Sequence, residues 1–545
     1  MKLTSSVVTL ALIAVLVGCR GSGPKPSASG AVALNYTLLE TADWAYRIDE
    51  DGKLVSAYHR GDFDDSPEEK MVPSPVDNLT YEKFNLLSPY NPSEGRGSSG
   101  TMWELLLHRG ENRPRLRYLV DDPSGQLKVS IEDPRPNAGN LYNGSREAPR
   151  IEIKSSFYDE VEIQGWMNRL WYGIPPNEPA PVGPYNLSNT IYNGHVFWDA
   201  DVWMMPALAL FAPDRARSIL LYRQEKQAQA AKNFVEWDQA GRPNAKGQSK
   251  PSGIKGGLKF PWESAKTGKE VAPATSRYED HITGSVAWSQ NYGAMLGIIP
   301  KGRAEAIKKG AAAFYMARSE PSPEGRHIRA VMSPDENHIG DDDLYTNLLA
   351  QWCTGEKFYL PKDSKSLLTY EGDPVRSYKQ AAAVLAIYPL QDPVAVSQAR
   401  VMMERFGDKT IPNGPAMSGS IHALIWARLG ETERAYATWQ DSWQPYKRGN
   451  GLMAEKRHKP ETNFLTGQAG CLQTVLYGFC GFVVDWKPQP GALWSKQLKS
   501  GAWISIKPHL PAKWKSVTLN PVVLDGVRYK VEISPSQVNV TQGDR

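Results

Sequence analysis

The pattern of apolar residues changes its period twice along the chain, and this change restricts the folds that the sequence can adopt. From about residue 156 to 487 apolar side chains recur at helical spacing, as in Trp288, Tyr292 and Met295. On either side of this stretch apolar and polar residues mostly alternate, which is typical of strands. The sequence therefore predicts β structure, then many medium-length helices, then a small β unit. Helices in this number pack in pairs, as a bundle or a toroid, and the period alone fits both.

The two β regions carry different local signals. Short alternating runs separated by Pro, Gly and Asn occupy residues 34–155, and a sandwich is the natural packing for such strands. In the tail, Asp525-Gly526 lies between two apolar runs, which is a strong hairpin signal. We therefore predict a β-sandwich domain at 34–155, a helical domain at 156–487 and a C-terminal β domain at 488–545.

The N-terminal residues predict export and lipid anchoring. Lys2 precedes an apolar run, Val7 to Val17, which is shorter than the ~20 residues that a membrane-spanning helix needs. The run ends in Leu-Val-Gly-Cys19, which resembles a bacterial lipobox, although an ordinary cleavable signal could carry a Cys there by chance. Residues 20–33 are rich in Gly, Ser and Pro, like a flexible tether. We predict a signal peptide at 1–19, lipidation of Cys19, and membrane anchoring in a bacterial envelope, at the outer membrane or in the periplasm.

Charge and cysteine content argue against several classes of protein. The chain has 63 basic and 59 acidic residues, whereas a nucleic-acid binder usually has a concentrated basic face. Cys353, Cys471 and Cys480 are odd in number and lack metal-binding spacing, so we predict buried thiols rather than a disulfide framework or a zinc site. The acidic run Asp341 to Asp343 could bind Ca²⁺, but such runs more often cap helices. We expect no nucleic-acid partner, no metal and no cofactor.

Two loops of the helical region place an indole beside a carboxylate. These pairs are Trp198-Asp199 and Trp262-Glu263. A sugar needs an apolar surface for its C–H face and acceptors for its hydroxyls, but a buried Trp beside a helix-capping acid would give the same pattern. Two such pairs in one region favour sugar binding. Glu279 lies just before a helical stretch, where it could be a cap or a catalytic acid that must keep its proton near neutral pH.

Several motifs occur in the order found in glycoside hydrolase family 65, and the chain resembles that family over about residues 165–515. The motifs are His195-Val-Phe-Trp-Asp-Ala-Asp, Lys259-Phe-Pro-Trp-Glu-Ser, Glu279-Asp-His-Ile-Thr-Gly, Ser333-Pro-Asp-Glu, Leu344-Tyr-Thr-Asn, Lys379-Gln380, Asn463-Phe-Leu-Thr-Gly and Pro508-His-Leu-Pro-Ala-Lys-Trp. The resemblance implies a mainly α protein, in which an (α/α)6 barrel follows an N-terminal β-sandwich and precedes a small C-terminal β domain. It also implies an inverting, exo-acting α-glucosidase of the hydrolytic branch, with α-1,2-glucosides of the kojibiose or glucosyl-galactose type as candidate substrates.

The resemblance assigns roles to the matching residues. Glu279 matches the general acid. Glu455 matches the general base of hydrolytic members, with Glu461 as second choice because the surrounding segment is unusually basic. In an inverting enzyme the two carboxyls flank a water, about 6.5–9.5 Å apart. Groups that hold the non-reducing glucose match Trp198, Asp199, Trp262, Glu263, Lys379 and Gln380, and Glu336 is a candidate near the leaving group. The family's usual Lys-Gln-Ala-Asp ends in Ala382 here, so one carboxylate is missing beside the sugar.

Two other functions fit part of this pattern. A family 65 disaccharide phosphorylase would bind phosphate with a His and a Ser in the segment 463–470, where this chain has Phe464 and Gly467. Neither residue supplies a side-chain donor, which a phosphate dianion requires, so hydrolysis is favoured. A non-catalytic sugar-binding lipoprotein would keep the indole–carboxylate pairs but could lose either glutamate. Both Glu279 and Glu455 are present, which favours an enzyme.

Overall fold

The computed structural model describes residues 149–543 apart from short gaps, together with seven strands between residues 36 and 132. The gaps fall at 175, 178, 186–191, 193–194, 243–249, 265–267, 271, 273–277, 450–451 and 460–463. The predicted signal peptide, the tether, Cys19 and Glu461 lie outside the described residues.

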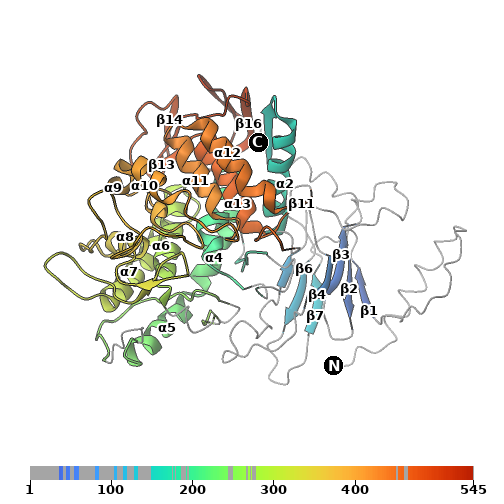
Figure 1. The fold of residues 1–545 in the computed structure, drawn as a ribbon. Coiled ribbons are helices and arrows are strands. Elements are labelled where there is room, and N and C mark those ends of the chain that lie inside the picture. Colours follow the sequence, from blue (N-terminus) through green and yellow to red (C-terminus); the bar gives the residue numbers. More distant parts are fainter. Residues whose placement is uncertain are drawn as a thin grey trace, which may run out of the picture.

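Helices dominate the chain between residues 157 and 479 (Figure 1). The α-helices are α2 (Phe157–Gly173), α3 (Met205–Ala209), α4 (Pro213–Glu225), α5 (Gln227–Gln239), α6 (His281–Met295), α7 (Lys301–Arg318), α8 (Leu344–Thr354), α9 (Pro393–Ser397), α10 (Ala399–Phe406), α11 (Ser418–Arg428), α12 (Thr432–Trp443) and α13 (Leu465–Gln473). Shorter helical segments are η5 (Ala200–Met204), η7 (Ala383–Ala386), η8 (Gln444–Tyr446) and η9 (Thr474–Phe479). The predicted helical stretch and the observed one therefore agree.

Local signals explain where several of these helices begin and end. α4 begins with Pro213 followed by Asp214, a residue order that suits a helix start. The carboxylate of Asp343 accepts the backbone N–H of Thr346 at 2.8 Å and caps α8. The same helix ends at Gly355, whose φ of 75° is a conformation that favours glycine. The acidic run at 341–343 thus supplies a helix cap, one of the two roles predicted for it.

The N-terminal strands form two antiparallel sheets. One contains β1 (Tyr36–Glu40), β2 (Trp44–Asp49), β3 (Leu54–His59) and β4 (Thr80–Phe84) in sequence order. The other contains β5 (Glu104–Leu106), β6 (Arg115–Leu119) and β7 (Lys128–Glu132), with Arg115 opposite Glu132. Their β character was predicted, and their packing as a sandwich stays a prediction.

The C-terminal strands form two further sheets, of which one recruits a strand from far away in the sequence. β13 (Phe482–Asp485), β14 (Trp494–Gln497) and β15 (Trp503–Ile506) are ordered β13-β15-β14, while β16 (Ser516–Leu524), β17 (Val527–Ile533), β18 (Val538–Gln542) and β8 (Arg150–Lys154) are ordered β18-β17-β16-β8. The predicted hairpin is confirmed, with Leu524 opposite Val527 and both Asp525 and Gly526 at positive φ. β8, placed in the N-terminal β region from the sequence, pairs instead with β16.

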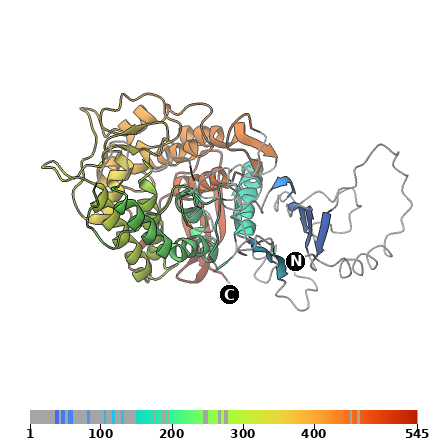
Figure 2. The same cartoon turned by 90° about the horizontal axis from the view of Figure 1, so that it is seen from below.

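A cluster of buried tryptophans fixes the C-terminal sheet to the helices. In both views α2, in teal, lies beside the red C-terminal strands (Figures 1 and 2). Trp166 of α2 meets Trp439 and Trp443 of α12 edge to face, with ring centroids 5.9 and 5.5 Å away. Trp514 meets Trp439 at 5.7 Å and donates its indole N–H to Asp159 at 2.8 Å. Edge-to-face contacts stabilise a core beyond the area that they bury.

The three cysteines of the helical region lie in its interior. Cys353, Cys471 and Cys480 are free and buried, which confirms the prediction of buried thiols. Across the part of the chain that the structure describes, every helix is too short or too polar to cross a bilayer.

Candidate active site

Several helical segments begin at the rim of one cavity of about 460 Å³. Asp199 comes directly before η5, Met417 before α11 and Phe464 before α13, and all three line the cavity. The positive ends of these segments therefore face the cavity. Of the residues predicted to bind or convert a sugar, the cavity is lined by Trp198, Asp199, Trp262, Glu336, Lys379, Gln380 and Glu455.

The aromatic wall of the cavity is built by the two predicted indoles. The rings of Trp198 and Trp262 lie 6.4 Å apart with an interplanar angle of 36°. Phe197 packs edge to face on Trp262 at 5.8 Å, and His281 packs on Trp198 at 4.5 Å. These contacts hold both indoles in place, so that only a small part of each meets the cavity. A rigid apolar wall of this kind suits the C–H face of a pyranose.

Asp199 adds a titratable carboxyl to this wall. The Thr466 hydroxyl donates to it at 2.7 Å. The pKa of Asp199 is raised to about 7, mainly because the carboxyl is buried. The bond from Thr466 lowers this pKa, and the carboxylates of Glu336 and Glu455 raise it. Asp199 therefore changes charge near neutral pH. Thr466 was not predicted individually, although it lies inside the Asn463-Phe-Leu-Thr-Gly motif.

A hairpin brings Glu336 to the cavity. The hairpin consists of β9 (Val331–Met332) and β10 (Ile339–Gly340), and Glu336 is at its tip with a φ of 60°. One carboxylate oxygen accepts from Lys379 Nζ at 2.7 Å and the other from Gln380 Nε2 at 2.8 Å. The predicted sugar-binding pair and Glu336 therefore form one polar platform, in which each side chain fixes the others.

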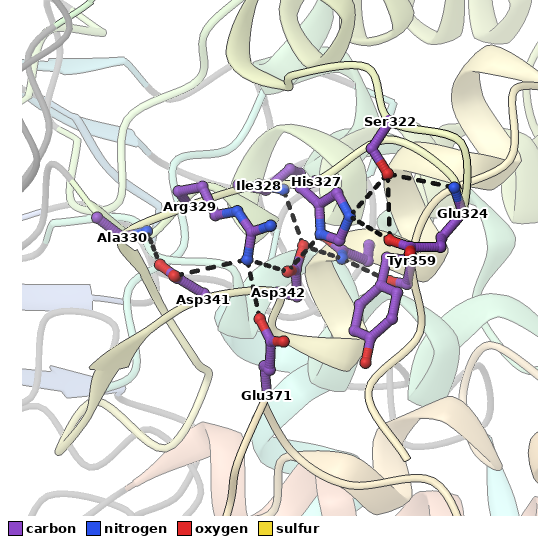
Figure 3. Close-up of polar contacts among 11 residues, drawn as sticks. Ser322, Glu324, His327, Ile328, Arg329, Ala330, Asp341, Asp342, Tyr359 and Glu371 are labelled. Carbon is purple, nitrogen blue, oxygen red and sulfur yellow. Dashed lines mark hydrogen bonds and ion pairs between the residues drawn. The ribbon is translucent and has the colours of Figure 1, made fainter.

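The base of this hairpin is held by a buried carboxylate, shown in Figure 3. Asp342 accepts from His327 Nδ1 at 2.8 Å and from Arg329 Nη1 at 3.0 Å. It also accepts from the backbone N–H of Ile328 at 3.0 Å and from Asn347 Nδ2 at 3.1 Å. With these donors around one carboxylate, the two ends of the hairpin are tied together. Asp342 thereby positions Glu336 without reaching the cavity.

The same cluster contains a serine, a histidine and an aspartate in contact one after another, as in the triad of a serine hydrolase. Its geometry excludes that role. Ser322 Oγ lies 3.2 Å from His327 Nε2, and His327 Nδ1 contacts Asp342 (Figure 3). However, the N–H of Glu324 donates to Ser322 Oγ itself, and the N–H of Gly325 donates to the Ser322 carbonyl. These are the donors that an oxyanion hole would need. The Glu324 carboxylate, 3.4 Å from Ser322 Oγ, also opposes a developing negative charge.

Glu279, the predicted acid, is buried just ahead of α6. Its side chain is 3 % exposed, and Oε2 lies 3.0 Å from His281 Nε2. Burial raises the pKa of Glu279 well above its usual range, and the carboxylates of Glu336 and Asp343 raise it further. Burial also lowers the pKa of His281 to about 3, so this imidazole is neutral and supplies no cation. The raised pKa of Glu279 favours its protonated form, which is the form that a general acid needs.

Its neighbour Asp280 has the opposite environment. Arg318 Nε donates to Asp280 at 2.6 Å, and both side chains are almost fully buried. The guanidinium compensates the Asp280 charge, whereas no Lys or Arg of the described residues forms an ion pair with Glu279. The charge of Lys379 lowers the pKa of Glu279, but burial and the neighbouring carboxylates outweigh it. The two adjacent carboxyls therefore lie in different electrostatic environments.

Glu455, the predicted base, follows β12 (Leu452–Met453) and is bound by tyrosine hydroxyls. Tyr192 donates to Glu455 Oε2 at 2.8 Å and Tyr185 at 3.4 Å. Its backbone carbonyl accepts the N–H of Ala416 at 2.8 Å. These contacts hold the Glu455 carboxyl group in place at the cavity. The two tyrosines were not predicted, because nothing in the sequence links them to a residue some 270 positions away.

Glu263 lies away from the cavity, and Gly467 has no room for a side chain. Glu263 is fully buried, is absent from the cavity lining, and lies 2.8 Å from His195 Nδ1. It braces the loop that carries Trp198, and its role as a sugar ligand stays a prediction. At Gly467, a Cβ would come within 2.6 Å of the carbonyl oxygen of Ala416. The backbone therefore occupies the space that a side chain at this position would need.

The candidate Ca²⁺-binding run is engaged by the protein. Asp341 accepts the backbone N–H of Ala330 at 2.9 Å, Asp342 ties the hairpin, and Asp343 caps α8. In the described ranges, no group of three or more His, Cys, Asp and Glu side chains has an arrangement that could hold a metal ion.

A mainly helical fold with a cavity walled by indoles and carboxyl groups, one of them bound by tyrosine hydroxyls, is typical of the glycosidase class of site. Glu279 is buried outside the cavity lining, near enough to Glu336 and Lys379 for their charges to shift its pKa. Residues 170–358 match the model of the glycosyl hydrolase family 65 central catalytic domain, and the chain belongs to glycoside hydrolase family 65. It is 34 % identical over 433 residues to protein-glucosylgalactosylhydroxylysine glucosidase of Danio rerio, covering 71 % of this chain and 63 % of that protein. The Mus musculus protein of the same name is 32 % identical over 518 residues, covering 80 % and 70 %.

A bacterial relative and a solved structure extend the comparison. Kojibiose hydrolase of Mucilaginibacter mallensis is 30 % identical over 391 residues, covering 65 % of this chain and 52 % of that protein. The chain thus spans between about half and two thirds of the length of the zebrafish and bacterial relatives. A solved structure described as a kojibiose phosphorylase from the human microbiome has a TM-score of 0.57 at 15 % identity, covering 74 % of this chain and 58 % of that one. This likeness shows that the fold is shared.

Proposed function

We propose that the protein is an inverting, exo-acting α-glucosidase that hydrolyses α-glucosides. The observation that carries this proposal is the contrast between Glu279, whose pKa burial raises well above its usual range, and Glu455, to which two tyrosine hydroxyls donate. The relatives named as glucosidases and kojibiose hydrolases support it. Their names also favour α-1,2-linked units, of the kojibiose or glucosyl-galactose type, as substrates.

The proposed mechanism is a single displacement. The terminal glucose lies against Trp198 and Trp262, and the platform of Glu336, Lys379 and Gln380 holds hydroxyls or the leaving group. Glu279 gives its proton to the glycosidic oxygen as the bond to C1 breaks. Glu455 takes a proton from a water that attacks C1 from the opposite face, so an α-glucoside yields β-glucose. Proton exchange with solvent then restores both carboxyls.

Water rather than phosphate is the proposed nucleophile. Phe464 and Gly467 stand where a phosphorylase of this family would supply donors to phosphate, and Gly467 has no room for a side chain. The assay is turnover of an α-glucosyl disaccharide with and without phosphate. Accumulation of glucose 1-phosphate in phosphate buffer would overturn this part of the proposal.

We also propose that the helices form an (α/α)6 barrel. Several helical segments begin at the cavity, as the inner helices of such a barrel would. The lipobox-like sequence ending at Cys19 supports a lipid anchor and a place in the bacterial envelope. Mass spectrometry of the purified N-terminus is the measurement, and an unacylated terminus that starts elsewhere would contradict the anchor.

Paired substitutions test the catalytic assignment. Loss of general acid or base help typically lowers the rate about 10²–10⁴-fold. Glu279→Gln should recover partly on aryl glucosides with good leaving groups, because these need less protonation. Glu455→Ala should stay slow on all substrates until azide replaces the activated water. If Glu461→Ala is inactive while Glu455→Ala is not, the base is Glu461, and α-glucose as the first product would exclude inversion.

A further inference from the structure

A second hollow lies at the far end of the helix that begins beside Glu279. The last two turns of α6, with Trp288 and Tyr292, form one wall. Trp352 of α8 and Trp486, just after β13, also line it, and its volume is about 870 Å³. Since a helix rises about 1.5 Å per residue, this wall lies roughly 10–20 Å along α6 from its active-site end.

The aromatic rings of this hollow line a gap instead of filling it. Trp288 and Tyr292 stack on each other at 5.2 Å, and Lys308 Nζ lies 4.1 Å from the centroid of the Trp352 ring. Neither Trp352 nor Trp486 touches another aromatic ring in the described part of the chain. Trp486 is 50 % exposed. By contrast, the core indoles of Trp166, Trp439, Trp443 and Trp514 pack edge to face and are fully buried. An indole left half in water at the edge of a hollow is typical of a binding surface.

Hydrogen-bond acceptors accompany these rings. In Asp392, Oδ1 accepts the backbone N–H of Val394 and of Ala395. In Asp485, Oδ1 accepts the N–H of Trp486 at 2.6 Å. The second oxygen of each carboxylate has no hydrogen bond to any described residue, and both residues line the hollow. Two acceptors are thus held by their partner oxygens and remain available to a ligand.

We infer that this hollow is a second saccharide-binding site, distinct from the active site, which holds a pyranose unit of a glycan chain. A pyranose presents a C–H face to an indole and hydroxyl donors to a carboxylate, which is the combination found here. An apolar peptide helix would cover Trp352 and Trp486 but leave the two carboxylates desolvated without donors, at a cost in binding free energy. Binding at two places would also raise the effective concentration of a long glycan at the active site.

Affinity electrophoresis of the full chain tests the site, with amylopectin and dextran as α-linked probes and laminarin as a β-linked one. Glu279→Gln serves as the background so that the probes are not degraded. We expect at least one probe to retard this protein, and Trp486→Ala to weaken binding about five- to tenfold, the contribution of one aromatic contact. Asp485→Asn provides a second, milder change. Tyr158→Ala, at an equally exposed ring on α2, is the matched control and should leave retardation unchanged.

The outcomes separate this inference from the proposed function. With Glu279 intact, Trp486→Ala should hydrolyse a disaccharide as the wild type does and lose only its advantage on long glycans. If no probe retards the protein, or if Trp486→Ala and Asp485→Asn bind as tightly as the control, the second site is wrong. Failure of the wild type to hydrolyse any α-glucoside would overturn the proposed function and leave the electrophoresis result unaffected.

Discussion

The tyrosine contacts to Glu455 make the sharpest quantitative test of the active site. Tyr192 donates at 2.8 Å and Tyr185 at 3.4 Å to the same oxygen, so the first is a normal hydrogen bond and the second is at the limit of one. A hydrogen bond to a charged group contributes about 1.5–3 kcal/mol, which corresponds to roughly 10- to 150-fold in rate. Because Tyr185 remains in place, we expect Tyr192→Phe to lower kcat/KM near the lower end, about 10- to 30-fold. Tyr185→Phe should cost about threefold or less.

The assay is glucose release from an α-glucosyl disaccharide, with thermal unfolding as a check that both variants fold. A second measurement separates a contact with Glu455 from a general packing effect. In a Glu455→Gln background the carboxylate is gone, so adding Tyr192→Phe should change the residual rate little. Equal losses for the two tyrosine variants, or a full tenfold loss from Tyr192→Phe in that background, would refute the reasoning.

Buried charged groups should make both the stability and the substrate affinity of this protein sensitive to single substitutions and to pH. Arg318→Met should lower the free energy of unfolding by about 3–5 kcal/mol in urea titrations, because it leaves Asp280 buried without its cation. The control is Arg400→Met at the exposed Arg400–Glu431 pair, which should lower the free energy of unfolding by less than about 1 kcal/mol. Because the pKa of Asp199 is about 7, Asp199 becomes a better hydrogen-bond acceptor as the pH rises from 5.5 to 8, and KM should fall over this range. Asp199→Asn should flatten this dependence of KM on pH. If the variant keeps the wild-type pH profile, Asp199 does not bind the sugar. The pKa of Asp343 is also about 7, against 3.8 for the unfolded side chain. Between these two values the folded protein keeps a proton that the unfolded chain releases, so the free energy of unfolding should fall as the pH rises from about 4 through 7. Asp343→Asn should reduce this slope in urea titrations at several pH values.

Local signals in the sequence were sufficient for the order of elements and for the aromatic part of the cavity wall. Trp198, Asp199 and Trp262 were singled out because an indole beside a carboxylate has its own chemistry, whereas Glu336, Lys379, Gln380 and Glu455 were assigned only through the family resemblance. The helical period of the middle region reports burial against neighbouring turns, and the Asp525-Gly526 turn needs only adjacent residues. These features depend on a few consecutive positions, and a single sequence contains them.

Features that join distant segments had no such signal. The Tyr192 contact to Glu455 spans 263 positions, and β8 finds its partner strand in the tail. Glu263 was expected at the sugar with Trp262, yet the adjacent side chains point to different surroundings. Trp262 lines the cavity, whereas Glu263 contacts His195. Which neighbour faces a ligand is decided by tertiary packing, and a motif does not encode it.

The close approach of Ala416 to Gly467 bears on how this chain could change its chemistry over evolutionary time. The carbonyl of Ala416 stands where a side chain at 467 would begin, and the N–H of the same residue is bound to the carbonyl of Glu455. Any mutation that adds a donor at 467 must therefore move the backbone that also supports Glu455. If water is the nucleophile, as proposed, a donor at 467 requires a shift of the Pro415–Ala416 segment, and we expect laboratory evolution toward phosphate as the acceptor to change that segment first.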